Sequence, residues 1–475
     1  MRSSVQKAVL VVLAATALAG VLRGYRLGTP PEKIFDEVYY ASDGCLYAGE
    51  DSSECGLDAN VERSWVHPPL GKTIIGWGID AFGNRPFGWR ISAAIAGTLT
   101  VALVGALAFL LTASWVWAGV AALLLATENL HFVQSRIAML DVFLALFVVL
   151  GFLFLVADRV RRDRTDQAMS SESESEEPTG DGAPAAPPAP DAGSEKRGGP
   201  GLRPLRLAAG AALGAAVAVK WSGVLALAAA PVLALAWERT RRKRSGAAHP
   251  LLRALRDEWL GLALAFLVVP FLAYAAAWIP WLLDRGFSFT EWFRHHRFMA
   301  DYHFGLSTIG EDGKPIHPYM SEAWTWFLLL RPVAYFWHGT DRTGTEILGI
   351  GHPLLFWGAL LVIPYLALTW STARDWRAGA ILVPILAQYV PWLIVRRPAF
   401  LFYLTPVTPF LALGTTYLLR DLSALRFRKP WAAPLAVAVV IAVCVGVFAF
   451  FWPVLIGDTV SLEAWRARVR FRGWI

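Results

Sequence analysis

Two adjacent carboxylates, Asp36 and Glu37, are the first side chains of this 475-residue chain that could perform acid–base chemistry. They lie in a polar segment, residues 24–89, that separates two long apolar runs. A carboxylate beside a membrane surface is partly desolvated, and desolvation raises its pKa towards that of a useful general base. The pair is therefore a candidate general base, and a solvated acidic pair is the alternative.

The same polar segment ends in the sequence HPPLGK, residues His67–Lys72. Its two prolines restrict the backbone to an extended turn, so the histidine before them and the lysine after them would be held rigidly. Either His67 and Lys72 belong to a substrate site, or the segment is a turn that leads into an amphipathic helix.

Charged residues also interrupt or flank later apolar runs. Arg136 and Asp141 stand at the start of one run, and ionisable groups at membrane depth are functional candidates by default. Arg136 could bind a phosphate through two nitrogen atoms, or it could form an interhelical salt bridge. Lys220, followed by Trp221, either extends to the membrane surface or binds an anion.

Further cationic and aromatic groups come late in the chain, namely His317, Tyr319 and Arg397. No HxxH or CxxC spacing is present, so we expect no protein metal cage, and a need for a divalent metal is left open. Carboxylates, arginine, lysine and histidine gathered on one membrane face suit a substrate with a lipid tail and a phosphate.

Long apolar runs must position these side chains. The chain is 56% hydrophobic, with a mean hydropathy of +0.45, whereas soluble domains have about 45–50% apolar residues. Helices satisfy their own backbone hydrogen bonds in lipid, so we predict an all-α polytopic membrane protein. Eleven spans are expected, at about residues 7–23, 90–112, 114–128, 137–157, 206–220, 222–237, 260–281, 352–370, 378–395, 400–419 and 432–455.

The basic residues predict how these spans are oriented. The net charge is +7, and the lysines and arginines cluster just outside apolar runs, which indicates the positive-inside rule rather than nucleic-acid binding. With the N-terminus inside the cell, the candidate side chains share the outer face. The arginine-rich tail, 466–472, breaks the pattern, so either a span is miscounted or the tail lies on the outer surface. We favour the second interpretation.

Two features bear on the cellular setting. The first apolar run, 8–22, lacks a convincing signal-peptide cleavage site and is interpreted as a retained first helix. Cys45 and Cys55 share the first polar segment and would form a disulfide if that segment is outside the cell, with two free thiols as the alternative. Cys444 lies in an apolar run and is interpreted as packing.

Residues about 163–202 contain a run of serine and glutamate followed by alanine, proline and glycine. Such a composition cannot bury a core. We predict a disordered cytoplasmic linker that can be deleted with activity largely retained.

In combination, these motifs resemble the protein O-mannosyltransferases. The segments that carry the resemblance are Phe35–Glu37, His67–Lys72, Gln134–Asp141, Val219–Gly223, His317–Trp326, Arg331–Val333, Gly351–Pro353 and Tyr389–Trp392. The later segments resemble the bacterial and actinobacterial branch, the polyprenol-phosphate-mannose–protein mannosyltransferases. The resemblance covers nearly the whole chain outside residues 163–202.

The resemblance implies a membrane glycosyltransferase of the GT-C fold. It would move mannose, with inversion, from polyprenyl-phosphate mannose to a Ser or Thr of an exported protein, without a cofactor. Asp36 would be the general base, with Glu37 beside it, and Arg136, then Lys220 and Arg397, would bind the donor phosphate. The other substrate-site candidates are His67, Lys72, Asp141, Trp221, His317 and Tyr319.

The expected organisation has two parts. Residues 1–245 form a transferase domain with the outer catalytic loop 24–89, and residues 259–475 form a C-terminal domain of about four spans with outer loop 282–351. Expected partners are the lipid-linked donor, exported proteins with the export translocon, and membrane lipid, but no nucleic acid. The expected location is the cell membrane, with the active site on its outer face.

Two alternatives stay open. One is a GT-C transferase for another sugar or for a lipid acceptor. The other, more remote, is a transporter, which the gathering of charges at one face disfavours. The segment 282–351 is too short for the β-trefoil domain that eukaryotic protein O-mannosyltransferases carry between their two halves.

Overall fold

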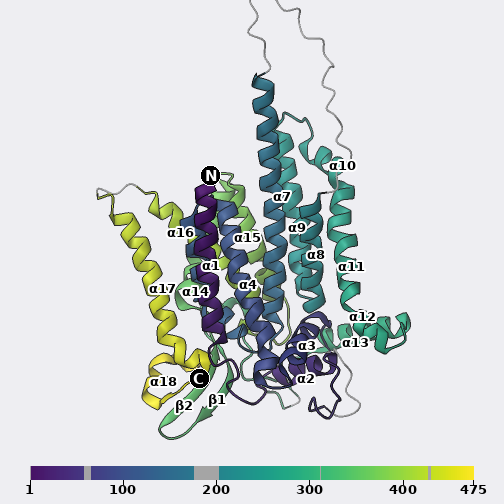
Figure 1. Ribbon diagram of the computed structural model, residues 1–475, viewed down its shortest axis with the longest axis vertical. Coiled ribbons are helices and arrows are strands. Elements are labelled where there is room, and N and C mark those ends of the chain that lie inside the picture. The colour runs from purple at the N-terminus through teal and green to yellow at the C-terminus, as the bar shows by residue number, and fades with distance from the viewer. Residues whose placement is uncertain (1, 58–65, 176–202, 311, 426–428, 475) are drawn as a thin grey trace, which may run out of the picture.

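The computed structural model describes residues 2–57, 66–175, 203–310, 312–425 and 429–474, and these form a bundle of long helices (Figure 1). Within this described part, eight helical segments are long and apolar enough to cross a membrane. They are Ser3–Gly24, Pro86–Thr112, Asp141–Ala168, Gly223–Arg244, Pro250–Ala277, Pro353–Ser371, Leu401–Ser423 and Ala432–Ile456. The predicted helical membrane fold is confirmed, whereas the count of eleven spans stays a prediction.

The helices begin where local chemistry favours a start. Pro86, Pro204, Pro250 and Pro353 each stand at the first positions of a helix, where the missing N–H costs nothing. The helices are α1 (Arg2–Gly24), α2 (Glu37–Tyr47), α3 (Leu70–Phe82), α4 (Pro86–Thr112), α5 (Trp115–Ala126), α6 (Asn129–Gln134), α7 (Asp141–Ser175), α8 (Pro204–Val219), α9 (Gly223–Arg244), α10 (Pro250–Ala263), α11 (Val269–Ala277), α12 (Ile279–Asp284), α13 (Phe289–Gly305), α14 (Pro353–Ser371), α15 (Trp376–Tyr389), α16 (Thr408–Ser423), α17 (Ala432–Ile456) and α18 (Leu462–Arg468).

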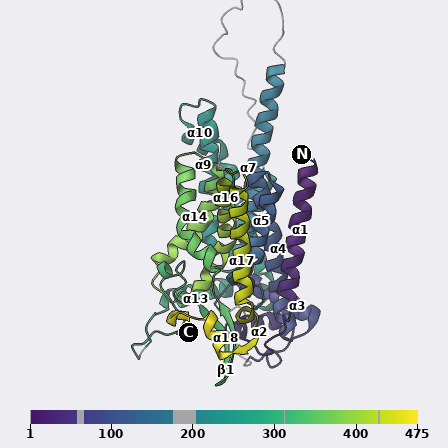
Figure 2. The ribbon, with the colours of Figure 1, turned by 90° about the vertical axis from the view of Figure 1, so that its left-hand side faces the viewer.

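One end of the bundle carries most of the non-spanning structure. Helices α2, α3, α13 and α18 lie at this end in both views, while α10 and the extension of α7 project at the other (Figures 1 and 2). We call it the loop end. It brings together the two long polar segments, 24–89 and 282–351, that the sequence predicts on one face.

A small antiparallel sheet at the loop end was not predicted. Strands β1 (Val333–Gly339) and β2 (Thr343–Gly349) form a hairpin with a bulge at Tyr335, and β3 (Thr459–Ser461) pairs with the other edge of β2. The chain is therefore mostly, but not entirely, helical.

The arginine-rich tail packs onto this sheet. Trp465 Nε1 donates a hydrogen bond to Glu346 Oε2 at 2.6 Å, and Trp474 Nε1 donates to the carbonyl of Leu329. Arg331 also donates to the carbonyl of Gly473 at 3.1 Å. The tail therefore lies at the loop end, beside the two long polar segments, and its location on the outer surface stays a prediction.

Ion pairs hold four helices together near the opposite end. Arg203 of the segment before α8 pairs with Asp158 of α7 at 2.9 Å and with Glu238 of α9 at 2.6 Å. Arg206 of α8 contacts Glu258 of α10 at 2.7 Å. These pairs are largely buried and multiply hydrogen-bonded, as buried charges must be.

The predicted linker is shorter than expected. Residues 163–175 continue helix α7, although the sequence analysis predicted them to be disordered. The ion pair between Arg159 and Asp163, one turn apart at 3.6 Å, supports the start of this continuation. Residues 176–202, which hold the rest of the predicted linker, lie outside the described residues.

We expect residues 176–202 to be dispensable. Replacing them with a Gly-Ser linker of about 12 residues should leave insertion, thermal stability and the predicted transferase activity within about twofold of the parent, since their composition supports no packed core. Detergent-extracted protein can be compared by thermal melting and by activity in membranes. A correctly inserted but inactive variant would reveal a function in this segment.

Candidate active site

Asp36 stands at the start of α2 on a constrained piece of backbone. Phe35 has a positive φ of 48°, an unfavourable conformation for a bulky residue. Its ring contacts Tyr335 at 5.1 Å, Phe402 at 5.8 Å and His317 at 5.7 Å, centroid to centroid. This aromatic packing holds the turn that presents Asp36.

The carboxylate of Asp36 is not used to cap its own helix. An N-cap aspartate usually accepts hydrogen bonds from backbone N–H groups of the first turn, but the Asp36 side chain makes no such bond. Instead, its Oδ2 accepts a hydrogen bond from the Tyr40 hydroxyl at 3.3 Å, one turn along α2. The half-buried carboxylate is therefore available to a substrate.

The electrostatic surroundings of Asp36 make its carboxylate more basic than usual. Burial raises its pKa to about 6; the Lys220 ammonium and the Tyr40 hydroxyl oppose the rise, and the Asp141 carboxylate adds to it. A base with such a pKa is ionised at neutral pH and is stronger than an ordinary carboxylate.

Glu37, the neighbouring acid, faces the interior. It is fully buried and forms a two-point ion pair with Arg90 of α4, with both N–O distances at 2.8 Å. It also accepts the backbone N–H groups of Ile34 at 3.0 Å and Ala138 at 2.8 Å. All of these partners are protein groups, so Glu37 anchors the turn, whereas the half-buried Asp36 lies near Lys220 and Asp141.

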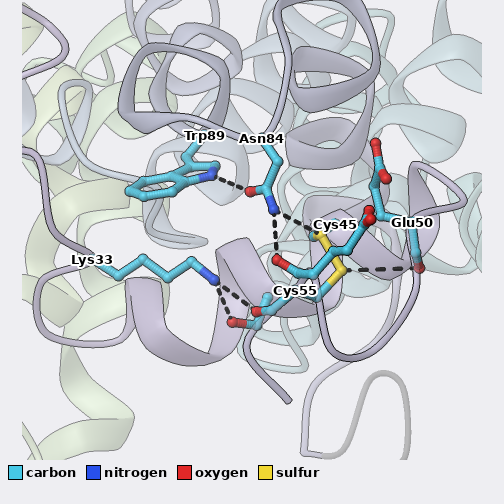
Figure 3. The surroundings of a disulfide bond; sticks show 8 residues. Lys33, Cys45, Glu50, Cys55, Asn84 and Trp89 are labelled. Carbon is cyan, nitrogen blue, oxygen red and sulfur yellow. Dashed lines mark hydrogen bonds between the residues drawn. A yellow bond between two sulfur atoms is a disulfide. The ribbon is translucent and has the colours of Figure 1, made fainter.

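A disulfide between Cys45 and Cys55 closes the first loop, which confirms the bridged interpretation (Figure 3). Asn84 donates to Cys45 Sγ at 3.3 Å and to the carbonyl of Glu54 at 2.9 Å, and accepts from Trp89 Nε1 at 2.7 Å. Because α2 carries Cys45, the bridge ties the helix that begins at Asp36 to the loop beyond it.

Lys220 and Asp141 meet although 79 residues separate them. The Lys220 Nζ lies 2.9 Å and 3.0 Å from the two carboxylate oxygens of Asp141, and both side chains are buried. The ammonium also lies 4.5 Å from the ring centre of Tyr403. Lys220 therefore does not extend to the membrane surface. It binds an anion, and that anion is the carboxylate of Asp141.

His67 lies beside this group. Its ring is 8% exposed and lies 5.9 Å from that of Tyr40, and its Nδ1 has no hydrogen-bond partner among the described residues. Burial, with Lys220 as the next cause, lowers the pKa of His67 well below the usual value, so the ring is neutral. Lys72 supports the turn by pairing with Asp43 at 2.7 Å and donating to the His67 carbonyl at 3.3 Å.

Arg397 approaches from the second half of the chain. Its Nη1 lies 3.1 Å from Nδ1 of His303, at the end of α13, and its buried Nε has no hydrogen-bond partner in the described part of the chain. No carboxylate among the described residues pairs with Arg397. A cation of this kind is suited to binding an anionic ligand.

Three other predicted residues lie at the margins. Trp221 donates to the Tyr274 hydroxyl at 3.1 Å, and its ring lies 6.0 Å from that of His303. His317 accepts the backbone N–H of Tyr319 at 3.2 Å and packs on Phe35. The Tyr319 ring lies 5.5 Å from the guanidinium of Arg331.

Arg136 makes contacts that favour a structural role. Its Nη1 donates to the carbonyls of Arg23 and Tyr25 at 2.7 Å and of Leu22 at 3.2 Å, at the C-terminal end of α1. It is 5% exposed. A cation there satisfies carbonyls that a helix end leaves without partners.

The interhelical salt bridge that was the alternative for Arg136 would need a nearby carboxylate, and the two that are close in sequence, Asp141 and Glu128, have other partners. Asp141 pairs with Lys220, and Glu128 accepts backbone N–H groups, including that of His352 at 2.8 Å.

We expect Arg136→Ala to lower stability more than turnover, because four backbone carbonyls, those of Leu22, Arg23, Tyr25 and Arg26, would lose a donor. Arg136→Lys should be intermediate, since one ammonium cannot reproduce the planar contacts. Thermal melting beside kcat and donor KM would separate the two effects. A stable Arg136→Ala protein with a much reduced kcat would instead restore the phosphate-binding role.

Sequence reasoning missed several members of the site. Tyr40, His303 and Tyr403 were not singled out, and neither was Arg90, which binds Glu37. The i,i+4 spacing of Asp36 and Tyr40 was a usable signal for a hydrogen bond on one helix face. His303 had no local signal, since its partners Val66 and Arg397 are far away in the chain.

Among the described residues, no group of three His, Cys, Asp or Glu side chains could hold a metal ion.

Comparison with known proteins places the chain in a family. A family model described as "Dolichyl-phosphate-mannose-protein mannosyltransferase" matches residues 81–170, and one described as "C-terminal four TMM region of protein-O-mannosyltransferase" matches residues 288–474. A Mycolicibacterium smegmatis (strain MKD8) protein named polyprenol-phosphate-mannose–protein mannosyltransferase is 31% identical, over 97% of this chain and 91% of its own length. The chain belongs to the protein O-mannosyltransferase family. A protein of the same name from Mycobacterium tuberculosis (strain H37Rv) is 30% identical, over 97% of this chain and 90% of its own.

Solved structures show the same fold. The Saccharomyces cerevisiae protein O-mannosyltransferase Pmt1–Pmt2 complex bound to the sugar donor matches with a TM-score of 0.75 and 13% identity, over 99% of this chain and 93% of that chain. ArnT from Cupriavidus metallidurans bound to undecaprenyl phosphate matches with a TM-score of 0.55 and 17% identity, over 94% and 76%. This mannosyltransferase-family member is thus a multi-pass membrane glycosyltransferase with the GT-C fold.

Proposed function

We propose that the protein transfers mannose from a polyprenyl-phosphate mannose donor to Ser or Thr hydroxyls of proteins. The observation that carries the proposal is that the loop end holds both a carboxylate that does not cap its helix, Asp36, and a cation, Arg397, that pairs with no carboxylate among the described residues. The names of the curated relatives support the choice of donor and acceptor.

The reaction is a single displacement with inversion. Asp36 accepts the proton of the acceptor hydroxyl as its oxygen bonds to the anomeric carbon of mannose. The bond between that carbon and the phosphate oxygen breaks, and its electron pair leaves with the polyprenyl phosphate. No acid is needed for the leaving group, because a phosphate leaves without a proton, so one carboxylate suffices.

Positive charge is needed where the phosphate leaves. The phosphate gains negative charge as the bond breaks, and groups that bind that charge more strongly in the transition state lower the barrier. Arg397 is our first choice for this role. Lys220 would add positive potential from within its ion pair with Asp141. Arg136 is the third choice for binding the phosphate, because its guanidinium already donates to backbone carbonyls.

We further propose that the loop end faces the outside of the cell membrane, where acceptor proteins would arrive during export through the translocon. The basic segments at the opposite end support this orientation, since positive loops favour the cytoplasmic side. The disulfide at the loop end supports it too, because disulfides persist in oxidising compartments.

Transfer of label tests the proposal. The protein in lipid vesicles would be given polyprenyl-phosphate [³H]mannose and a Thr-rich peptide. We expect the peptide to become labelled and alkaline elimination to release the labelled mannose from it. Vesicles that carry the Asp36→Asn variant serve as the control. Absence of peptide labelling while the donor is still bound would refute mannose transfer to proteins.

A GT-C transferase for another sugar or a lipid acceptor is the second candidate, and the fold shared with ArnT favours it over a transporter. Labelled lipid in place of labelled peptide would favour this candidate.

A further inference from the structure

His303 occupies a central place in the site without any assigned role. It is close to the end of α13, and its half-buried ring lies 5.1 Å from that of His67 and 6.0 Å from that of Trp221. It therefore joins the first polar loop to the C-terminal half of the chain.

Two hydrogen bonds define the tautomer of His303. The Arg397 guanidinium can only donate, so His303 Nδ1 accepts its hydrogen bond at 3.1 Å. The Val66 carbonyl can only accept, so His303 Nε2 carries the hydrogen and donates it at 2.7 Å. Only a neutral imidazole can make both bonds, because an imidazolium has no acceptor nitrogen.

The surroundings keep the ring neutral. Burial, with the charges of Arg397 and Lys220, lowers the pKa of His303 to about 4, and the hydrogen bond to the Val66 carbonyl opposes this fall. Of the charged groups that act on the ring, two are cations and none is a carboxylate.

A neutral partner has a specific consequence for Arg397. A carboxylate in the place of His303 would orient the guanidinium but also neutralise it. The imidazole orients the guanidinium and leaves the positive charge available, with the buried Nε still unpartnered among the described residues. Val66 precedes His67, so the same ring also links Arg397 to the His67 turn.

We propose that His303 is a positioning residue that holds the guanidinium of Arg397 towards the donor phosphate while preserving its full charge. The inference rests on the proposed function of the site, in which Arg397 binds that phosphate. His303 itself touches neither sugar nor phosphate in this scheme.

Two substitutions separate the two hydrogen bonds of His303. An asparagine places its amide oxygen near the position of Nδ1 and can still accept from Arg397, whereas a glutamine places its amide nitrogen near Nε2 and can still donate to Val66. We expect His303→Gln to lower kcat/KM for the donor about tenfold or more, as for a lost hydrogen bond to a charged group. We expect His303→Asn to stay within about threefold of the parent.

Thermal melting controls for folding, and His338→Gln is the matched control, because His338 is an exposed histidine at the loop end. An asparagine variant that is as impaired as the glutamine variant, with both proteins folded, would overturn the proposal, because keeping the hydrogen bond to Arg397 would then not preserve activity.

A double-mutant cycle with Arg397→Ala provides the second test. If His303 acts through Arg397, His303→Gln should add less than about twofold to the effect of Arg397→Ala. Effects that multiply would overturn the inference. The proposed function fails separately: if Arg397→Ala leaves the donor KM and kcat unchanged, Arg397 does not bind the phosphate.

Discussion

Replacement of Asp36 by asparagine is expected to lower kcat by about 10²–10⁴-fold, the usual contribution of a general base. Among the described residues, the carboxylate has one hydrogen-bond partner, Tyr40, and it does not cap its helix, so little structure depends on its charge. Melting temperature and membrane insertion should therefore stay close to those of the parent. The measurement is the initial rate of mannose transfer at saturating donor and peptide.

Asp80→Asn is the matched control for this substitution, because Asp80 is an exposed aspartate on α3 at the same end of the molecule. If Asp36→Asn keeps more than about a tenth of the parent rate, Asp36 is not the base.

The pH profile offers an independent check on the same carboxylate. Because the pKa of Asp36 is raised to about 6, its basic form predominates above that pH and is lost as the pH falls through it. The rate of the parent enzyme should fall accordingly in mildly acidic buffer. The residual rate of Asp36→Asn should lack this inflection.

Replacement of Glu37 by glutamine is expected to lower the stability of the fold, whereas Asp36→Asn is expected to lower kcat. It would leave the fully buried Arg90 without its anion, and removal of one partner of a buried ion pair typically costs about 3–5 kcal/mol. We expect poor accumulation of the protein and a much lower melting temperature. Fluorescence-detected gel filtration and thermal melting would measure both.

A double substitution tests the cause of that instability. Glu37→Leu combined with Arg90→Leu removes both charges and should be milder than Glu37→Leu alone. Some loss will remain, because Arg90 also donates to the carbonyls of Pro30 and Glu32. A Glu37→Gln protein that folds normally but does not turn over would show that Glu37 belongs to the chemistry.

The sequence predicted the structure best in the membrane-spanning helices, because the thickness of the bilayer sets their length. The predicted spans 352–370 and 432–455 correspond to helices Pro353–Ser371 and Ala432–Ile456, because a segment that crosses a bilayer must be apolar for about twenty residues. The hairpin of β1 and β2 had a usable signal that was overlooked. Two runs rich in aromatic or β-branched residues flank the turn residues Thr340–Arg342.

The sequence could not predict which of Asp36 and Glu37 is the buried ion-pair partner of Arg90. The two acids are adjacent, so only the fold decides which one faces Arg90, 53 residues away, and which faces the substrate side. Arg136 illustrates the same limit, because its partners are backbone carbonyls, which are present at every residue and leave no pattern. Motifs identify the groups at a site, but their partners follow from tertiary structure.

The order of the strands also affects how the protein must be made. The hairpin is synthesised before α17, but the strand that covers its second edge, Thr459–Ser461, follows α17. Until α17 has inserted, that edge of β2 stays unpaired, and open strand edges promote aggregation. Protease sensitivity of Thr340–Arg342 in ribosome-bound chains that stop before Ala432 would measure this exposure. The loop end is thus expected to finish folding only after the membrane bundle is complete, so that a stalled chain would remain open to quality-control proteases.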